Sequence, residues 1–146
     1  MGIIRLLHVA DTHLGASPYG LAERESDFYD AFREVVDIAI ERRVNAVIHG
    51  GDLFHVSRPK PLTLIKAVEE LQRLRNAGID FIVAPGNHEL PKGERVGSPV
   101  RLLEKLGLAR ASHDVNRPEV YSVGDVSIIV FSEWSSELLA RLDPAG

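Results

Sequence analysis

The sequence of 146 residues contains no cysteine. This absence excludes disulfides, thiolate nucleophiles and cysteine-ligated zinc sites, and it suits a protein of the reducing cytoplasm. No apolar run approaches the roughly 20 residues that cross a bilayer, and the N-terminal segment reaches His8 and Asp11 too soon for a signal peptide. The net charge of −4 excludes a generally basic nucleic-acid-binding protein. Binding of a polyanion would therefore require a local basic patch on the protein, or metal ions that supply positive charge.

The composition is that of a globular protein, with 45% hydrophobic and 26% charged residues, and we expect residues 1–146 to form a single domain. Strand-like apolar runs occupy residues 3–10, 44–49 and 79–84. Helical spacing of apolar residues predicts three helices. The first begins at Ser26 or Asp27, the second covers residues 61–77, and the third covers residues 99–106. This alternation predicts an α/β fold with a mainly parallel sheet and right-handed crossovers.

The pattern changes near the end of the sequence. Two β-rich runs, 120–123 and 126–131, flank Gly124 and Asp125, which form a two-residue turn signal. We therefore expect an antiparallel hairpin here, and a last short helix at 135–142.

Polar residues cluster where three of the predicted parallel strands end. The loops read ADTHLG (residues 10–15), HGGDLFH (residues 49–55) and APGNHE (residues 84–89). Ligands of open α/β sheets bind outside the carboxyl ends of the strands, so we expect these loops to converge. The candidate metal-site residues are Asp11, His13, Asp52, Asn87 and His88.

Carboxylate, imidazole and amide ligands suit Mn²⁺, Fe²⁺ or Zn²⁺, and manganese is favoured as oxygen ligands increase. Asp52, in the middle loop, is the natural bridge between two ions, and such a pair can clamp the attacking and leaving oxygens of a phosphate ester. Each motif alone is more often a turn or a cap. Three such motifs in order, each directly after a predicted strand, favour a metal site.

The remaining histidines differ in their expected roles. His49 ends the buried strand, and we expect it to support the turn structurally. His55 lies on the loop beyond Asp52, which would face a substrate. His8 is expected to be a core histidine, and His113 a solvent-exposed one.

The order D-x-H, GD and GNH resembles the opening signature of calcineurin-like metallophosphoesterases. HVADTHLG, ESDFYDAFREVVDIAIE, VIHGGDLFHVSRPKPLTL and GNHE together resemble, more particularly, the DNA double-strand-break repair nucleases of the SbcD and meiotic-recombination-eleven type. The resemblance implies the N-terminal half of a four-layer α-β-β-α sandwich, with a mainly parallel sheet flanked by helices and a C-terminal hairpin.

Carried onto this sequence, the resemblance assigns Asp11 and His13 to a first metal, Asp52 to both metals and Asn87 to a second. His88 would stabilise the transition state or protonate the leaving group, and His55 would sit beside the phosphate. Basic residues in loops near the expected metal edge favour a polyanionic substrate; these are Arg24, Arg58, Lys60, Lys92 and Arg95.

The resemblance also implies two Mn²⁺ ions, with Mg²⁺, Fe²⁺ or Zn²⁺ possible, and DNA as the substrate. It implies a homodimer formed through the helices near residues 61–77 and 100–106. An ABC-type ATPase is the partner expected for the full-length family, although its docking segment has no counterpart here. The implied location is the cytoplasm, in association with the DNA, or the nucleus if the protein is eukaryotic.

Two departures from the family pattern matter. GNHE ends in Glu89 where the family usually has aspartate, and the family's later metal histidines, one isolated and then a G-H-x-H pair, have no counterpart. Either the chain is the first part of a longer nuclease, or it is a short, non-catalytic module that dimerises or binds a partner. In both cases we expect weak metal binding and little nuclease activity. A further alternative is a phosphoesterase acting on small phosphodiesters or phosphoproteins.

Overall fold

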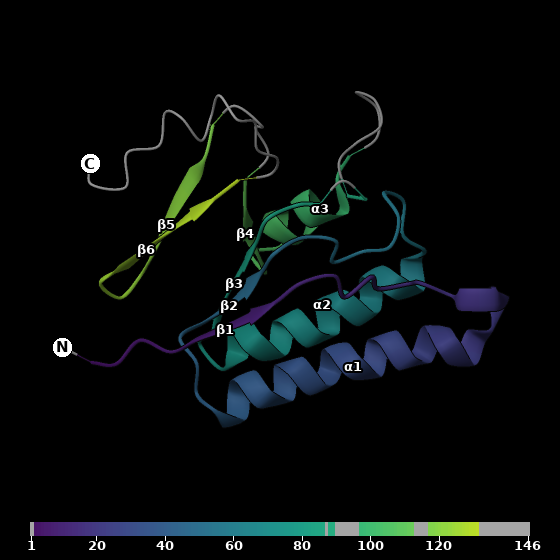
Figure 1. The fold of residues 1–146 in the computed structure, drawn as a ribbon, viewed down its shortest axis with the longest axis horizontal. Helices are drawn as coiled ribbons and strands as arrows, with labels where there is room; N and C mark the ends of the chain where they lie inside the picture. Colours follow the sequence, from purple (N-terminus) through teal and green to yellow (C-terminus); the bar gives the residue numbers. More distant parts are fainter. Residues whose placement is uncertain (1, 87, 90–96, 113–116, 132–146) are drawn as a thin grey trace.

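The computed structural model describes residues 2–86, 88–89, 97–112 and 117–131. Its centre is a four-stranded sheet, in the spatial order β1-β2-β3-β4, in which all neighbouring strands are parallel (Figure 1). The strands are β1 (Leu6–Val9), β2 (Ala46–His49), β3 (Asp80–Val83) and β4 (Arg110–Ala111). The predicted parallel sheet is confirmed, and β4, which the sequence analysis did not identify, extends it by one short strand.

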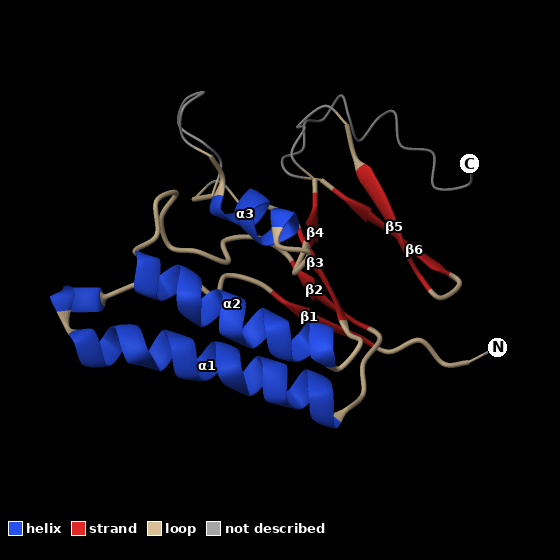
Figure 2. Cartoon of the chain, turned by 180° about the vertical axis from the view of Figure 1, so that it is seen from behind, coloured by secondary structure: helices blue, strands red, loops and turns tan. Residues whose placement is uncertain are grey.

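The three α-helices of the described residues cover one face of this sheet (Figure 2). They are α1 (Ala22–Glu41), α2 (Pro61–Asn76) and α3 (Pro99–Lys105), and a short 3₁₀ helix η1 (Pro18–Gly20) precedes α1. Because the strands follow one another in space as in sequence, right-handed crossovers place every connecting helix on the same side. The core between helices and sheet includes Phe32, Leu71, Val47, Val83 and Leu103.

The expected hairpin is formed by β5 (Glu119–Val123) and β6 (Val126–Val130), with Gly124 at a positive φ of 61° in its turn. Val123 and Val130 pack with Ala46 and Ile82, on the sheet face opposite the helices (Figure 1). The layers are therefore helices, parallel sheet and hairpin, which is consistent with the predicted metallophosphoesterase fold. The helix expected at 135–142 lies outside the described residues.

Helix α1 differs from its prediction in start and in buried face. It begins at Ala22, before the expected cap at Ser26 or Asp27, and its first turns are held by the Tyr29 hydroxyl, which donates to Glu25 Oε1 at 2.6 Å. Its buried stripe is Tyr29, Phe32, Val36 and Ala39. The apolar residues at helical spacing in the sequence predict a different stripe, in which Ala31 and Ile38 are in fact exposed; that stripe is Phe28, Ala31, Phe32, Val35, Ile38 and Ala39. Aromatic and β-branched residues lie on more than one face of this helix. The spacing of apolar residues alone therefore does not determine which face packs against the sheet.

The expectation for His8 was wrong. Alternate residues of β1 point to opposite faces, so Leu7 and Val9 pack toward the helices while His8 lies on the other face. Since β1 is an edge strand, His8 stays exposed there. Within the described ranges, no helix is both long and apolar enough to span a bilayer.

Candidate metal centre

The loops that follow β1 and β2 run side by side and continue the hydrogen bonding of the sheet. Leu14 N–H donates to the Leu53 carbonyl at 2.8 Å, and His55 N–H donates to the Leu14 carbonyl at 3.0 Å. Leu14 and Phe54 form a parallel bridge, and both side chains are fully buried. The polar residues of the two loops are therefore mounted on buried, hydrogen-bonded backbone.

Three candidate ligands have left-handed backbone conformations. The φ angles of Asp11, His13 and Asp52 are 56°, 44° and 54°. Such conformations cost about 1 kcal/mol or more for residues other than glycine, and they persist where the surroundings fix them. Here the Asp11 N–H donates to the Gly51 carbonyl at 2.9 Å, and the His13 N–H donates to the Asp52 carbonyl at 3.0 Å. Backbone strain is thus concentrated at the residues predicted to bind metal.

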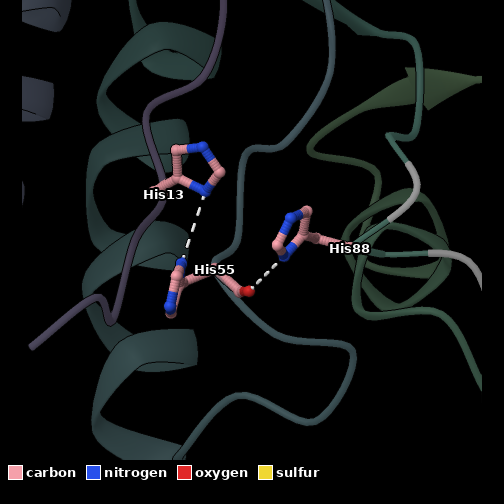
Figure 3. A group of neighbouring side chains, drawn as sticks. All are labelled: His13, His55 and His88. Carbon is pink, nitrogen blue, oxygen red and sulfur yellow. Dashed lines mark hydrogen bonds between the residues drawn. The ribbon is translucent and has the colours of Figure 1, made fainter.

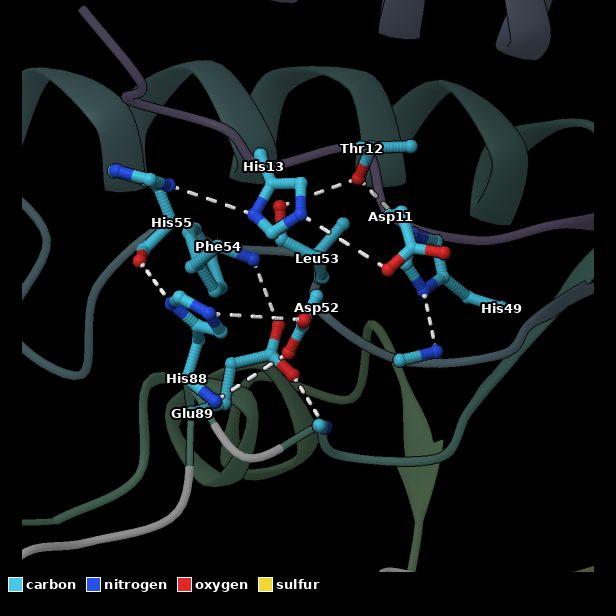
Figure 4. A network of polar contacts seen from close by, with 12 residues as sticks. Asp11, Thr12, His13, His49, Asp52, Leu53, Phe54, His55, His88 and Glu89 are labelled. Carbon is cyan, nitrogen blue, oxygen red and sulfur yellow. Dashed lines mark hydrogen bonds and ion pairs between the residues drawn. The ribbon is translucent and has the colours of Figure 1, made fainter.

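The side chains of Asp11, His13 and Asp52 converge (Figure 4). One ligand atom from each lies within 4.8 Å of the others, and His13 Nε2 is 3.9 Å from Asp11 Oδ1. Two carboxylates and one imidazole form a donor set that suits a divalent ion such as Mn²⁺, Fe²⁺ or Zn²⁺. The first two loops therefore come together as the sequence predicted.

The loop after β3 reaches the same place. The His88 N–H donates to Asp52 Oδ1 at 3.3 Å, and the His88 ring Nε2 is 3.9 Å from Asp52 Oδ2. A Cβ atom at Gly86 would overlap the Asp52 carboxylate, so only glycine allows this approach. Asn87, the fourth predicted ligand, lies outside the described residues, but Gly86 and His88 on either side of it contact Asp52.

Three imidazoles form a second group at the centre (Figure 3). His88 Nδ1–H donates to the His55 carbonyl at 2.7 Å, and the Nδ1 atoms of His55 and His13 are 3.5 Å apart. One ligand nitrogen from each of the three rings lies within 4.8 Å of the others. His55 and His88, predicted to act on substrate, are thus both beside the carboxylate cluster.

Glu89 joins two of the loops, a role that the sequence analysis did not identify. The side chain is fully buried, and its Oε1 and Oε2 accept hydrogen bonds from Phe54 N–H at 2.7 Å and Gly86 N–H at 2.8 Å. Burial raises the pKa of this carboxyl above its ordinary value, against the lowering effect of the backbone donors. The carboxylate therefore fixes the loop after β3 against the loop after β2.

His49 is fully buried and supports the turn, as expected. Its Nδ1 accepts the Gly51 N–H at 3.2 Å, so in the neutral ring the proton is on Nε2, which lies 2.9 Å from Thr12 Oγ1. The Thr12 hydroxyl then donates to the Leu53 carbonyl at 3.2 Å. Burial, followed by the proximity of His8 and His13, lowers the pKa of His49 to about 3. A neutral His49 thus connects the first two ligand loops.

The predicted substrate-binding cations are not all loop residues. Arg24 lies in the first turn of α1 and pairs with Asp27 at 3.3 Å, which corrects its expected place in a loop. Lys60 directly precedes α2 and pairs with Glu25 at 3.4 Å. Arg58 is exposed on the loop between β2 and α2. Lys92 and Arg95 lie outside the described residues.

Comparison with known proteins agrees with this geometry. Residues 4–139 match the calcineurin-like phosphoesterase family. The chain is 40% identical over 151 residues to the DNA double-strand break repair protein Mre11 of Sulfurisphaera tokodaii, covering 99% of this chain and 38% of that protein. It is 44% identical over 143 residues to the Mre11 protein of Saccharolobus solfataricus, covering 94% of this chain and 38% of that protein.

The Mre11 protein of Sulfolobus acidocaldarius is 38% identical over 141 residues, covering 92% of this chain and 37% of the relative. The chain thus spans less than two fifths of the length of these relatives. The match extends over all three ligand loops, from the strand before Asp11 to beyond Glu89. The chain belongs to the calcineurin-like phosphoesterase family of metal-dependent hydrolases.

Proposed function

We propose that this chain carries ligands of a two-metal, manganese-type phosphodiesterase that processes DNA ends. The observation that supports the proposal best is the convergence of Asp11, His13 and Asp52, whose ligand atoms lie within 4.8 Å of one another. Divalent metal binding is implied by the family, and this donor set fits a divalent ion.

The proposed roles follow from position. Asp11 and His13 hold a first ion, Asn87 contributes to a second, and Asp52 lies between the loops that carry them. A pair of divalent ions held by these residues would supply Lewis acidity toward the phosphate and toward an attacking water molecule. His88, hydrogen-bonded through Nδ1–H to the His55 carbonyl, presents Nε2 to the site and can donate a proton to a leaving oxygen if protonated. His55 lies beside it to contact the phosphate.

DNA is the proposed substrate because the relatives are named as DNA double-strand break repair proteins. Arg58, with Lys92 and Arg95 from the part of the sequence between β3 and α3, would contribute positive charge on a chain whose net charge is −4. We also propose that the protein acts with an ABC-type ATPase. Its proposed location is the compartment that holds the DNA, which is the cytoplasm or, in a eukaryote, the nucleus.

Manganese binding provides the first test. Asp11, His13, Asp52 and Asn87 supply fewer donors than two octahedral ions require, so water fills most positions and we expect weak binding. Titration of Mn²⁺, followed by electron paramagnetic resonance, should give an affinity that falls at least about tenfold in Asp52→Asn. Asp125→Asn, in the exposed hairpin turn, is the matched control. Equal affinity in both variants would contradict the proposed site.

The substrate is tested separately. With excess Mn²⁺, the chain should bind or cleave a DNA duplex in preference to a chromogenic phosphodiester, at a low rate given the weak metal affinity. Preference for the small diester would favour the alternative of a phosphoesterase acting on small molecules or phosphoproteins.

A homodimer through α2 and α3 is the second proposed property. Leu62 and Ile65 of α2 are 54% and 52% exposed, and Leu102 of α3 is 43% exposed. A groove of about 400 Å³ separates these helices, lined by Leu64, Pro99 and Leu102 among others. Sedimentation should detect a dimer that Ile65→Glu dissociates. A dimer whose melting temperature ignores Mn²⁺ would instead favour a non-catalytic dimerisation module, since ligands of a folded site raise its stability.

A further inference from the structure

We infer that His13, His55 and His88 form a second, tris-imidazole site, which shares His13 with the carboxylate site and selects a zinc-class ion. The ring of His13 stands between two donor sets. Asp11 and the imidazole of His55 lie on opposite sides of it (Figures 3 and 4). His88, whose Nε2 is 3.9 Å from Asp52 Oδ2, borders both sets. Each set, taken with His13, brings three ligand atoms within 4.8 Å of one another.

The separation of the imidazole nitrogens suits a shared ion. Two ligands at about 2.0–2.1 Å from a tetrahedral zinc ion are about 3.3–3.4 Å apart. The Nδ1 atoms of His13 and His55 are 3.5 Å apart, so they need to move very little to share one ion. Without an ion, two facing imidazole nitrogens are compatible only when one of them carries a proton.

The third ring is held with its free nitrogen available. A carbonyl oxygen can only accept, so the 2.7 Å contact between His88 Nδ1 and the His55 carbonyl fixes the proton on Nδ1. In the neutral ring the lone pair is then on Nε2. Histidine ligands of metals nearly always donate their other ring N–H in this way, which fixes the tautomer and the ring orientation.

The backbone under the three rings is fixed before any ion binds. The His55 N–H donates to the Leu14 carbonyl at 3.0 Å, and the His13 N–H donates to the Asp52 carbonyl at 3.0 Å. The side chains of His13 and His88 are 27% and 41% exposed, so an ion can enter from solvent. Three protein ligands with one position open to water are the arrangement of an open zinc site.

Ligand chemistry separates this site from the carboxylate site. Imidazole suits Zn²⁺, Cu²⁺ and Ni²⁺, whereas carboxylate and water suit Mn²⁺. The two ions should therefore respond differently to loss of an imidazole and loss of a carboxylate. This inference concerns metal binding alone and does not depend on the proposed hydrolysis of DNA.

The test compares His55→Asn with Asp52→Asn, using Zn²⁺ and Mn²⁺ as probes. Calorimetric titration with Zn²⁺ should show an affinity that falls at least about tenfold in His55→Asn, and much less in Asp52→Asn. Titration with Mn²⁺ should show the reverse, with a larger loss of affinity in Asp52→Asn than in His55→Asn. Co²⁺, added as an optical substitute for Zn²⁺, should give the intense visible absorption of a tetrahedral site in the unsubstituted chain and in Asp52→Asn, but not in His55→Asn.

His88→Gln is a second variant that should weaken Zn²⁺ as His55→Asn does, and circular dichroism checks that each variant is folded. The inference is overturned if Zn²⁺ fails to bind the unsubstituted chain, or if both metals respond to the variants in the same order. Loss of DNA hydrolysis with the metal pattern intact would count against the proposed function and not against this site.

Discussion

The buried histidine that ends β2 makes a sharp prediction about stability and pH. His49 is fully buried, and its pKa is lowered to about 3 from the ordinary 6.5. Between these values the unfolded chain binds a proton that the folded chain does not bind. The free energy of unfolding therefore falls as the pH is lowered from 6.5 toward 3, by up to about 1.4 kcal/mol for each pH unit.

The variant His49→Asn removes this titration while keeping an acceptor that can reach the Gly51 N–H. Urea unfolding at pH 7 and pH 5 should show that the unsubstituted chain loses about 2 kcal/mol more than the variant over this interval. Other groups titrate in both proteins, so their contributions cancel in the comparison. At pH 7 the variant should be the less stable of the two, because the Thr12 hydroxyl loses its hydrogen bond to the His49 ring.

Identical pH dependence in the two proteins would refute the reasoning, since it would mean that His49 is protonated in the folded state or accessible to water. A slope that is steeper in the variant would refute it as well. The same experiment in 1 M salt should leave the difference largely unchanged, because burial and not exposed charge is the main cause of the shift.

Three further predictions concern the contacts between the loops. Gly86→Ala should weaken Mn²⁺ binding at least about tenfold in a paramagnetic resonance titration, because its Cβ would overlap Asp52, whereas Gly97→Ala has open space and should have little effect. Thr12→Val should lower the free energy of unfolding by about 1 kcal/mol in urea, with Thr12→Ser restoring most of the loss. Glu89→Gln should cost about 1–3 kcal/mol, because it leaves a buried backbone N–H without an acceptor; unchanged unfolding would mean that water replaces the carboxylate.

Much of the fold could be predicted because its signals are local. The strand that ends at His49 is a short apolar run, and the hairpin around Gly124 has a turn that only certain residues make. The two-residue strand at Arg110 and Ala111 has no such signal, because it exists only where β3 offers an edge. The exposure of His8 likewise depends on which face of β1 the rest of the chain covers.

The convergence of the ligand loops could also be predicted, since parallel strands end at one edge. The connections between the loops could not. Glu89 bonds Phe54, 35 residues earlier in the chain, and Thr12 bonds His49, 37 residues later. Such contacts depend on the packed arrangement of several loops, and the sequence presents Glu89 only as a departure from the usual aspartate.

The ladder of hydrogen bonds that runs past the ends of β1 and β2 has a consequence for dynamics. Loop amides usually exchange with solvent through small local openings. The amides of His13, Leu14 and His55 are bonded between two loops whose side chains Leu14 and Phe54 are buried, so their exchange should be as slow as that of strand amides. An ion that binds there meets loops that are already ordered, and its affinity is not reduced by the entropy of fixing them.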